Sequence, residues 1–259
     1  EVGQTLHQSE GDSGGQVTGL SQLPCRRRLL YRAVPCCVGR SPSFGMRVLL
    51  FSGGVESTAL AYWQRPDLLL TIDYGQRPAA GELRAASHLA QHLDLPQEVV
   101  TANVAALGAG DMVGRGMASH SKVSEAWPFR NQFLVTVAAM ACADRGLKEI
   151  AVGTVITDRV HPDGNPEFVT AIDALIRCEL PDARVTAPAI NMTTVQLVRE
   201  SGVPHSLLRW TFSCHRETVG CGLCRGCTKT LETFAALGLN TAEHKNTPPP
   251  VVASFTGAD

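Results

Sequence analysis

Four cysteines crowd together near the carboxyl end of the sequence, at Cys214, Cys221, Cys224 and Cys227. Four thiolates complete a tetrahedral zinc shell and leave no open coordination position, which is typical of a structural site. Cysteines at this spacing also hold iron–sulfur clusters, and a disulfide pairing would need an oxidising compartment of which the sequence shows no sign. The motif therefore predicts one structural Zn²⁺ per chain, with a cluster as the alternative.

Three residues near the four cysteines, and two cysteines elsewhere in the sequence, also have expected roles. Gly222 and Gly226 permit tight loops that turn N–H groups toward sulfur. His215 follows Cys214 directly, but four cysteines already complete the shell, so we expect an exposed histidine. Cys142 and Cys178 fall in apolar helical stretches and are expected to be small core residues.

A second candidate site is the string Ser52-Gly53-Gly54-Val55-Glu56-Ser57-Thr58, which follows an apolar run ending at Phe51. Glycines let the backbone approach a ligand, and the first N–H groups of a following helix face an anion. The serine and threonine hydroxyls add donors. The string is neither a mononucleotide P-loop nor a dinucleotide fingerprint. The alternative to an anion site is a tight strand-to-helix turn.

Alternating strands and helices must position these motifs. Short apolar runs predict strands, and apolar residues at helical spacing predict helices. Such alternation predicts an α/β fold with a doubly wound parallel sheet. A Gly- and Ser-rich stretch at 105–125 is expected to be a loop over a site. The expected strands are 47–51, 68–72, 98–100 and 149–153, and the expected helices are 58–64, 82–93, 131–145, 166–176 and 193–200.

The composition limits the function classes. The chain has 259 residues, with 23 Lys+Arg against 24 Asp+Glu and a formal net charge of −1. Strong nucleic-acid binding needs a concentrated positive field, so the charge balance argues against it. The longest nearly apolar run, 133–143, falls short of the roughly 20 residues that cross a bilayer. With no secretion signal pattern, we expect a cytoplasmic protein without membrane contact.

Four segments follow from these patterns. Residues 1–45 are expected to be a disordered or non-native extension, and translated upstream sequence is preferred to a native arm or an Arg-rich targeting peptide. Residues 46–204 are the predicted α/β domain, 205–240 a helical zinc-binding region, and 241–259 a tail.

The glycine-rich string resembles the SGGxDS pyrophosphate-binding loop of the ATP pyrophosphatases, whose fold is adenine nucleotide α-hydrolase-like. That family cleaves ATP between the α and β phosphates and transfers AMP. Here Glu56 takes the place of the family's Asp, so the carboxylate sits on a longer arm. If this acid holds Mg²⁺, the longer arm alters the geometry of a metal that demands near-ideal octahedra.

The order of motifs resembles the 7-cyano-7-deazaguanine synthase family more narrowly, over residues 46–237. The shared motifs are the loop, Asp73-Tyr74-Gly75-Gln76-Arg77, Arg130-Asn131 and the late cysteine cluster. The resemblance implies an enzyme that uses ATP twice to convert 7-carboxy-7-deazaguanine and ammonia, through an amide, into a nitrile. It also implies Mg²⁺ and Zn²⁺.

The resemblance implies roles for individual residues. Segment 153–168 matches the family at Asp158, Asp163 and Glu167, whereas the family's Arg and Cys in this segment are absent, which suggests a changed acceptor or product. Asp163 is expected to accept two N–H bonds from a guanine-like edge. The implied catalytic residues are Glu56, Arg130 and Asp158; ATP and pyrophosphate are held by Phe51, Ser52, Gly53, Gly54, Ser57 and Thr58; and substrate is held by Asp73, Tyr74, Gln76, Arg130, Asn131, Asp163 and Glu167.

Two other functions are compatible with these motifs. In the first, the activated base passes to an amine of a protein or nucleic acid, as a diverged member of a defence system would do. A non-catalytic nucleotide-binding zinc scaffold is favoured if Glu56 disables the site. Thiolation and tRNA-lysidine chemistry fit less well, because the chain has no basic appendage. A homodimer is compatible with the sequence.

Overall fold

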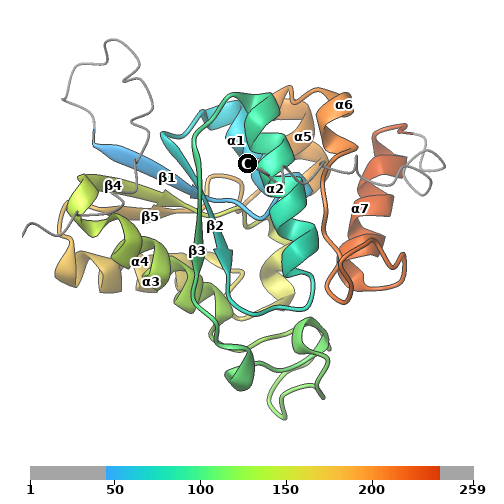
Figure 1. Cartoon of the computed structure of the whole chain (residues 1–259), viewed down its shortest axis with the longest axis horizontal. Helices are drawn as coiled ribbons and strands as arrows, with labels where there is room; N and C mark the ends of the chain where they lie inside the picture. The colour runs from blue at the N-terminus through green and yellow to red at the C-terminus, as the bar shows by residue number, and fades with distance from the viewer. Residues whose placement is uncertain (1–44, 240–259) are drawn as a thin grey trace, which may run out of the picture. The chain divides into compact units, whose positions relative to one another are not determined.

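A five-stranded parallel sheet forms the centre of the protein, whose computed structural model describes residues 45–239 (Figure 1). The strand order is β3-β2-β1-β4-β5. The chain adds β2 and β3 on one side of β1 and later adds β4 and β5 on the other. This order confirms the predicted doubly wound sheet. The strands are β1 (Met46–Leu50), β2 (Leu68–Asp73), β3 (Gln97–Thr101), β4 (Leu147–Ala151) and β5 (Arg184–Thr186).

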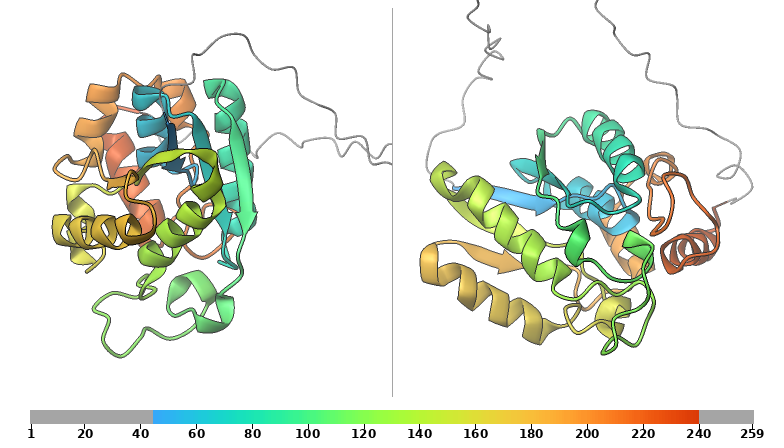
Figure 2. Two further views of the ribbon diagram at one scale, coloured as in Figure 1. Left: turned by 90° about the vertical axis from the view of Figure 1, so that its left-hand side faces the viewer. Right: turned by 60° about the horizontal axis from the view of Figure 1, so that its bottom comes forward.

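Helices cover both faces of the sheet (Figures 1 and 2). The helices α1 (Val55–Gln64), α2 (Ala79–Leu93) and α5 (Thr194–Ser201) pack on one face, and α3 (Arg130–Cys142) and α4 (Pro166–Glu179) on the other. Neighbouring residues of a strand point to opposite faces. In β1, Leu49 accordingly joins the first core and Val48 the second, and each is 1% exposed.

Local signals explain where the helices begin. α4 starts after Asn165, whose Oδ1 accepts the N–H of Phe168 at 2.8 Å, and a proline occupies its first position. α5 starts after Thr193, which forms a capping box with Gln196. α1 begins at Val55, three residues before the predicted start, because its cap is a glycine of the loop.

Several predicted boundaries and burials were wrong. β4 starts two residues early, because buried Leu147 belongs to it, and three-residue β5 was missed. Cys142 is buried as predicted, but Cys178 is exposed. The 105–125 segment contains two short 3₁₀ helices. The helices for which no bounds were predicted are α6 (His205–Leu208) and α7 (Arg225–Ala236), and both lie in the region that was expected to be helical.

The cysteine-containing end packs on the same core as the sheet. Leu208 of α6 and Phe234 of α7 belong to the cluster that contains Leu60. No helix within residues 45–239 is long and apolar enough to cross a membrane. Residues 1–44 of the predicted extension and the predicted tail 241–259 lie outside the described residues. The domain boundary predicted at residue 204 stays a prediction.

Candidate functional site

The glycine-rich loop turns from β1 into α1 with backbone groups facing outward. Gly53 has a φ of +74°, and Gly54 caps α1 without a side chain. The hydroxyl of Ser52 accepts the N–H of Gly54 at 3.3 Å. The first N–H groups of a helix have no partners within the helix, so this end of α1 has donors that can receive an anion.

Gly53 admits no side chain. A Cβ there would lie 2.7 Å from the N of Ala86, and φ is in the left-handed region. We expect Gly53→Ala to lower the free energy of unfolding by at least about 2 kcal/mol. Urea denaturation measures the loss. Gly116→Ala, whose Cβ would meet nothing within 4 Å, is the control; equal effects of the two substitutions would contradict the prediction.

The loop hydroxyls do not all face a ligand. Ser57 and Thr58 both donate to the carbonyl of Gly54, at 3.2 and 2.8 Å. Thr58 is fully buried and lies away from the cavity that the loop borders, whereas Ser52 and Ser57 line it. The structure therefore gives Thr58 a role in holding the turn.

That cavity, of about 310 Å³, lies at the carboxyl ends of β1, β2 and β4. Chain order reverses between β1 and β4, and ligands bind at such points in open α/β sheets. Most of the predicted site residues meet here although they are far apart in sequence. Those lining the cavity are Phe51, Ser52, Gly54, Glu56, Ser57, Tyr74, Arg130, Asn131, Asp158 and Asp163; those outside its lining are Gly53, Thr58, Asp73, Gln76 and Glu167.

The predicted residues outside the lining have other surroundings. Asp73 accepts the N–H of Gly75 at 3.0 Å, and buried Gln76 accepts the N–H of Tyr74 at 2.9 Å. Both side chains thus hold the turn after β2. Glu167 is exposed in the first turn of α4. In this structure Asp73 and Gln76 therefore serve the turn and do not line the cavity.

Lys229 of α7 joins the two predicted carboxylates. Its Nζ lies 2.9 Å from Oε1 of Glu56 and 2.9 Å from Oδ1 of Asp158. Glu56 also accepts the hydroxyl of Thr194 at 2.7 Å. Burial lowers the pKa of Lys229, but the two carboxylates more than offset this and raise the pKa above its ordinary value. Lys229 is therefore a charged ammonium in the cavity wall, and the sequence motifs did not reveal it.

Arg130, at the start of α3, lines the cavity beside Tyr74 and Met112. Its Nη1 lies 2.8 Å from Sδ of Met112, and its guanidinium faces the hydroxyl of Tyr74. Burial raises the pKa of that hydroxyl, against the lowering effect of Arg130. Next in sequence, Asn131 donates its backbone N–H to Oδ2 of Asp163 and its side-chain amide to the carbonyl of Asp163, both at 3.4 Å. The two predicted substrate residues Asn131 and Asp163 thus form one unit.

Glu82 of α2 also lines the cavity and was missed. Gln76 donates to its Oε2 at 2.7 Å. Burial raises its pKa to about 7, and the Gln76 bond and the charge of Arg130 oppose that rise. A carboxyl with this pKa is present in both protonation states near neutrality. The sequence signal that could have identified Glu82 is an acidic residue six positions after Gln76.

The raised pKa of Glu82 predicts a pH dependence of stability. Between pH 4.5 and about 7 the folded protein holds a proton that the unfolded chain has lost, so the free energy of unfolding falls as pH rises. Glu82→Gln cannot ionise, and relative to wild type it should gain up to about 3 kcal/mol across this window. Urea denaturation at pH 5 and pH 8 measures this. Exposed Glu179→Gln is the control, and parallel pH curves for wild type and Glu82→Gln would contradict the prediction.

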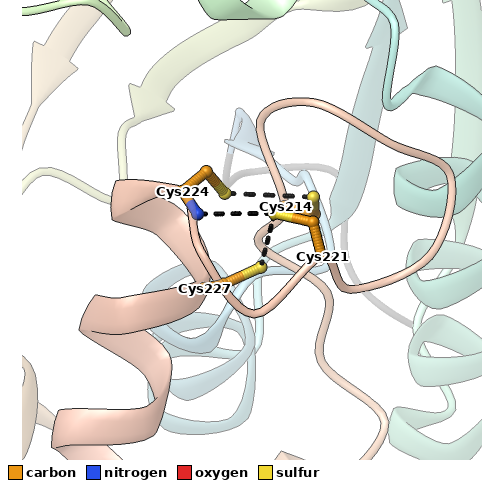
Figure 3. Close-up of side chains that lie close together, drawn as sticks. All are labelled: Cys214, Cys221, Cys224 and Cys227. Carbon is orange, nitrogen blue, oxygen red and sulfur yellow. Dashed lines mark hydrogen bonds between the residues drawn. The ribbon is translucent and has the colours of Figure 1, made fainter.

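The four cysteines converge as predicted (Figure 3). Their Sγ atoms lie within 4.8 Å of one another, and the Cys214–Cys224 and Cys221–Cys227 pairs are 3.9 Å apart. A zinc tetrahedron with bonds of ~2.3 Å has edges of about 3.8 Å. A cluster of several iron atoms would hold its cysteines further apart. The arrangement therefore fits a single zinc ion.

Backbone donors support thiolates at this centre. The N–H groups of Leu223 and Cys224 donate to Sγ of Cys221, at 3.5 and 3.3 Å. Burial raises the pKa of Cys221, but these bonds outweigh it and bring the pKa down to about 7. The N–H of His215 donates to Sγ of Cys224 at 3.3 Å.

Two predictions about this region were wrong. His215 is half-buried and lines the cavity, and burial, followed by the charge of Arg130, lowers its pKa to about 4. Gly226 lies in the first turn of α7 instead of a loop. It is small because a Cβ would collide with the carbonyl of Ser213. Gly222, with a φ of +74°, does form a tight turn.

Comparison with known proteins gives one consistent family. A family model described as queuosine biosynthesis protein QueC matches residues 46–238. The 7-cyano-7-deazaguanine synthase of Methanospirillum hungatei is 30% identical over 213 residues, covering 74% of this chain and 96% of that protein. The synthase of Koribacter versatilis is 30% identical over 222 residues, covering 75% and 90%. In both alignments the relative is matched over nearly its whole length.

Proposed function

Because this chain belongs to the QueC family of queuosine biosynthesis proteins, we propose that it activates a 7-carboxy-7-deazaguanine-type carboxylate with ATP and passes the acyl group to ammonia or another amine. A substrate carboxylate oxygen attacks the α-phosphorus, and pyrophosphate leaves. The observation that carries the proposal is the single cavity that joins an anion-binding loop, the ammonium of Lys229 and the guanidinium of Arg130.

The loop side of the cavity suits the leaving group. N–H groups at the start of α1 and the hydroxyls of Ser52 and Ser57 can donate to pyrophosphate oxygens. Lys229 adds a positive charge held in place by two carboxylates. Preorganised donors where negative charge develops contribute most to the rate of such a step.

Glu56 is the carboxylate that would hold Mg²⁺ beside this loop, because it lines the cavity. When bound, the ion supplies charge neutralisation on the phosphates. Glu56 itself is oriented by Lys229 at 2.9 Å and by the Thr194 hydroxyl at 2.7 Å. The longer arm of Glu56, compared with the aspartate of the SGGxDS loop, is thus held by two partners.

The part of the cavity lined by Arg130, Asn131 and Asp163 suits the base and its carboxylate. Arg130 can pair with the substrate carboxylate or the α-phosphate in a bidentate fork. Asp163, held by Asn131, can accept N–H groups from a guanine-like edge. Glu82 adds a carboxyl that donates or accepts according to its protonation state.

Incubation with ATP, Mg²⁺, 7-carboxy-7-deazaguanine and ammonium tests the proposal. We expect AMP and pyrophosphate together with an amide or nitrile of the base, detected by mass spectrometry. Absence of AMP with this substrate would refute it. A base-sized mass increase on a protein or nucleic acid, with little free nitrile, would instead identify a macromolecular amine as the acceptor. ATP binding without turnover, with turnover gained on Glu56→Asp, would identify a nucleotide-binding scaffold.

A further inference from the structure

A second charged cluster lines the same cavity. It consists of Glu125, His161 and Arg225, and all three line the cavity. Oε1 of Glu125 lies 3.8 Å from Nε2 of His161 and 3.1 Å from Nε of Arg225. No motif of the sequence pointed to these residues, and the adenylation step has no use for them.

The carboxylate of Glu125 is unusually placed. The residue is 7% exposed, and its Oε1 accepts no hydrogen bond from residues 45–239. A buried acceptor without a hydrogen bond is destabilising unless something compensates for it. The two nearby nitrogens are the available compensation. Arg225 also donates to the carbonyl of Thr157 at 3.3 Å, so its guanidinium serves two acceptors.

His161 lies on the substrate wall. Its own carbonyl accepts the N–H of Gly164 at 3.0 Å, and two residues later Asp163 is held by Asn131. Nε2 of the imidazole lies 3.8 Å from Oε1 of Glu125, an electrostatic contact that is longer than a hydrogen bond. The contact favours a proton on Nε2 and leaves the Nδ1 lone pair as the acceptor. Catalytic contacts of this kind are often long before substrate binds, and the pair needs only to shorten to orient His161 as a base.

We propose that His161, oriented by Glu125, is the general base that accepts the proton of the amine attacking the activated carboxylate. The inference rests on the proposed function and deepens it. The nitrogen–carbon bond forms as the carbon–oxygen bond to the phosphate breaks. AMP leaves with the electron pair of that bond, and the nitrogen proton moves to Nδ1 of His161.

The protonation state of His161 suits this role. Burial lowers its pKa, the positive charge of Arg130 lowers it further, and Glu125, Asp163 and Asp158 only partly oppose this. The ring is therefore neutral near neutral pH and can accept a proton. The attacking species is the free amine, and its nitrogen becomes positively charged as it bonds to carbon, so completion of the step depends on a base that removes this proton.

Two half-reactions separate this inference from the proposed function. Exchange of labelled pyrophosphate into ATP, with 7-carboxy-7-deazaguanine and no amine, measures activation alone. Amide formation with ammonium measures both steps. For His161→Asn we expect exchange within twofold of wild type and amide formation at pH 7 reduced by about 10²-fold or more. Hydroxylamine, which is largely unprotonated at neutral pH, should restore product as the hydroxamate.

Two further variants complete the test. Glu125→Gln should reduce amide formation less than His161→Asn and shift the acidic limb of its pH profile. His205→Asn, at an exposed histidine of α6, should leave both half-reactions unchanged. Unchanged amide formation in His161→Asn, a parallel loss of exchange, or no recovery with hydroxylamine would overturn the inference. A wild-type protein without exchange would overturn the proposed function instead.

Discussion

Replacing Cys224 by serine is expected to abolish stoichiometric zinc binding and to lower the melting temperature by roughly 6–12 °C, which corresponds to a loss of about 3 kcal/mol in a protein of this size. Cys224 is 1% exposed and caps the first turn of α7. Without a fourth thiolate the coordination shell is incomplete, and the loop from 214 to 224 is no longer held to α7 through the metal. Elemental analysis and thermal denaturation measure both effects.

The loss should extend to the catalytic cavity. α7 carries Lys229, and the N–H of Phe212, just before the cysteines, donates to the carbonyl of Gly53 at 2.9 Å. The zinc region therefore holds both a cation and one edge of the phosphate loop. Removing zinc from wild type with a chelator should reproduce the lower melting temperature.

Cys178→Ser is the matched control. Cys178 is exposed on α4, and its thiol donates to the carbonyl of Ala174 at 3.4 Å. Its substitution should leave zinc content and melting temperature unchanged. Full zinc content in Cys224→Ser would show that the four cysteines do not form the site.

Replacing Lys229 by methionine is expected to lower AMP formation by about 10²–10³-fold, the usual effect of removing one preorganised donor from a transition state. The substitution also leaves Glu56 and Asp158 without the cation that lies 2.9 Å from each. Their side chains are 18% and 29% exposed, so water compensates in part. We expect a loss of about 1–3 kcal/mol in the free energy of unfolding.

Two variants show which property of Lys229 matters. Lys229→Arg keeps the charge and should retain more AMP formation than Lys229→Met. Lys148→Met removes a lysine that pairs with Asp182 at the surface and is 47% exposed, and it should leave both activity and stability nearly unchanged. If Lys229→Met forms AMP at the wild-type rate, Lys229 has no part in holding the phosphates.

The helices and strands that were predicted correctly have strong local signals. The apolar run 68–72 and the helical spacing over 82–93 identify β2 and α2, because a buried strand and an amphipathic helix each impose a period on the sequence. β5 was missed because three residues are too few to show a period. No bounds were predicted for α7 because the cysteine spacing dominates the sequence where it begins.

The same distinction applies to the site. The sequence by itself determined the glycine-rich turn and the cysteine cluster, because each is a short contiguous segment whose residue types serve one ligand. It also indicated Arg130 and Asp163. Only the tertiary structure decided which groups face each other. Lys229 lies 173 positions after Glu56 in the sequence, yet their charged atoms are 2.9 Å apart. Glu125 and His161 meet in the same way. Such contacts depend on how helices and loops pack at the carboxyl edge of the sheet. The type of one residue does not indicate which distant residue this packing will place beside it.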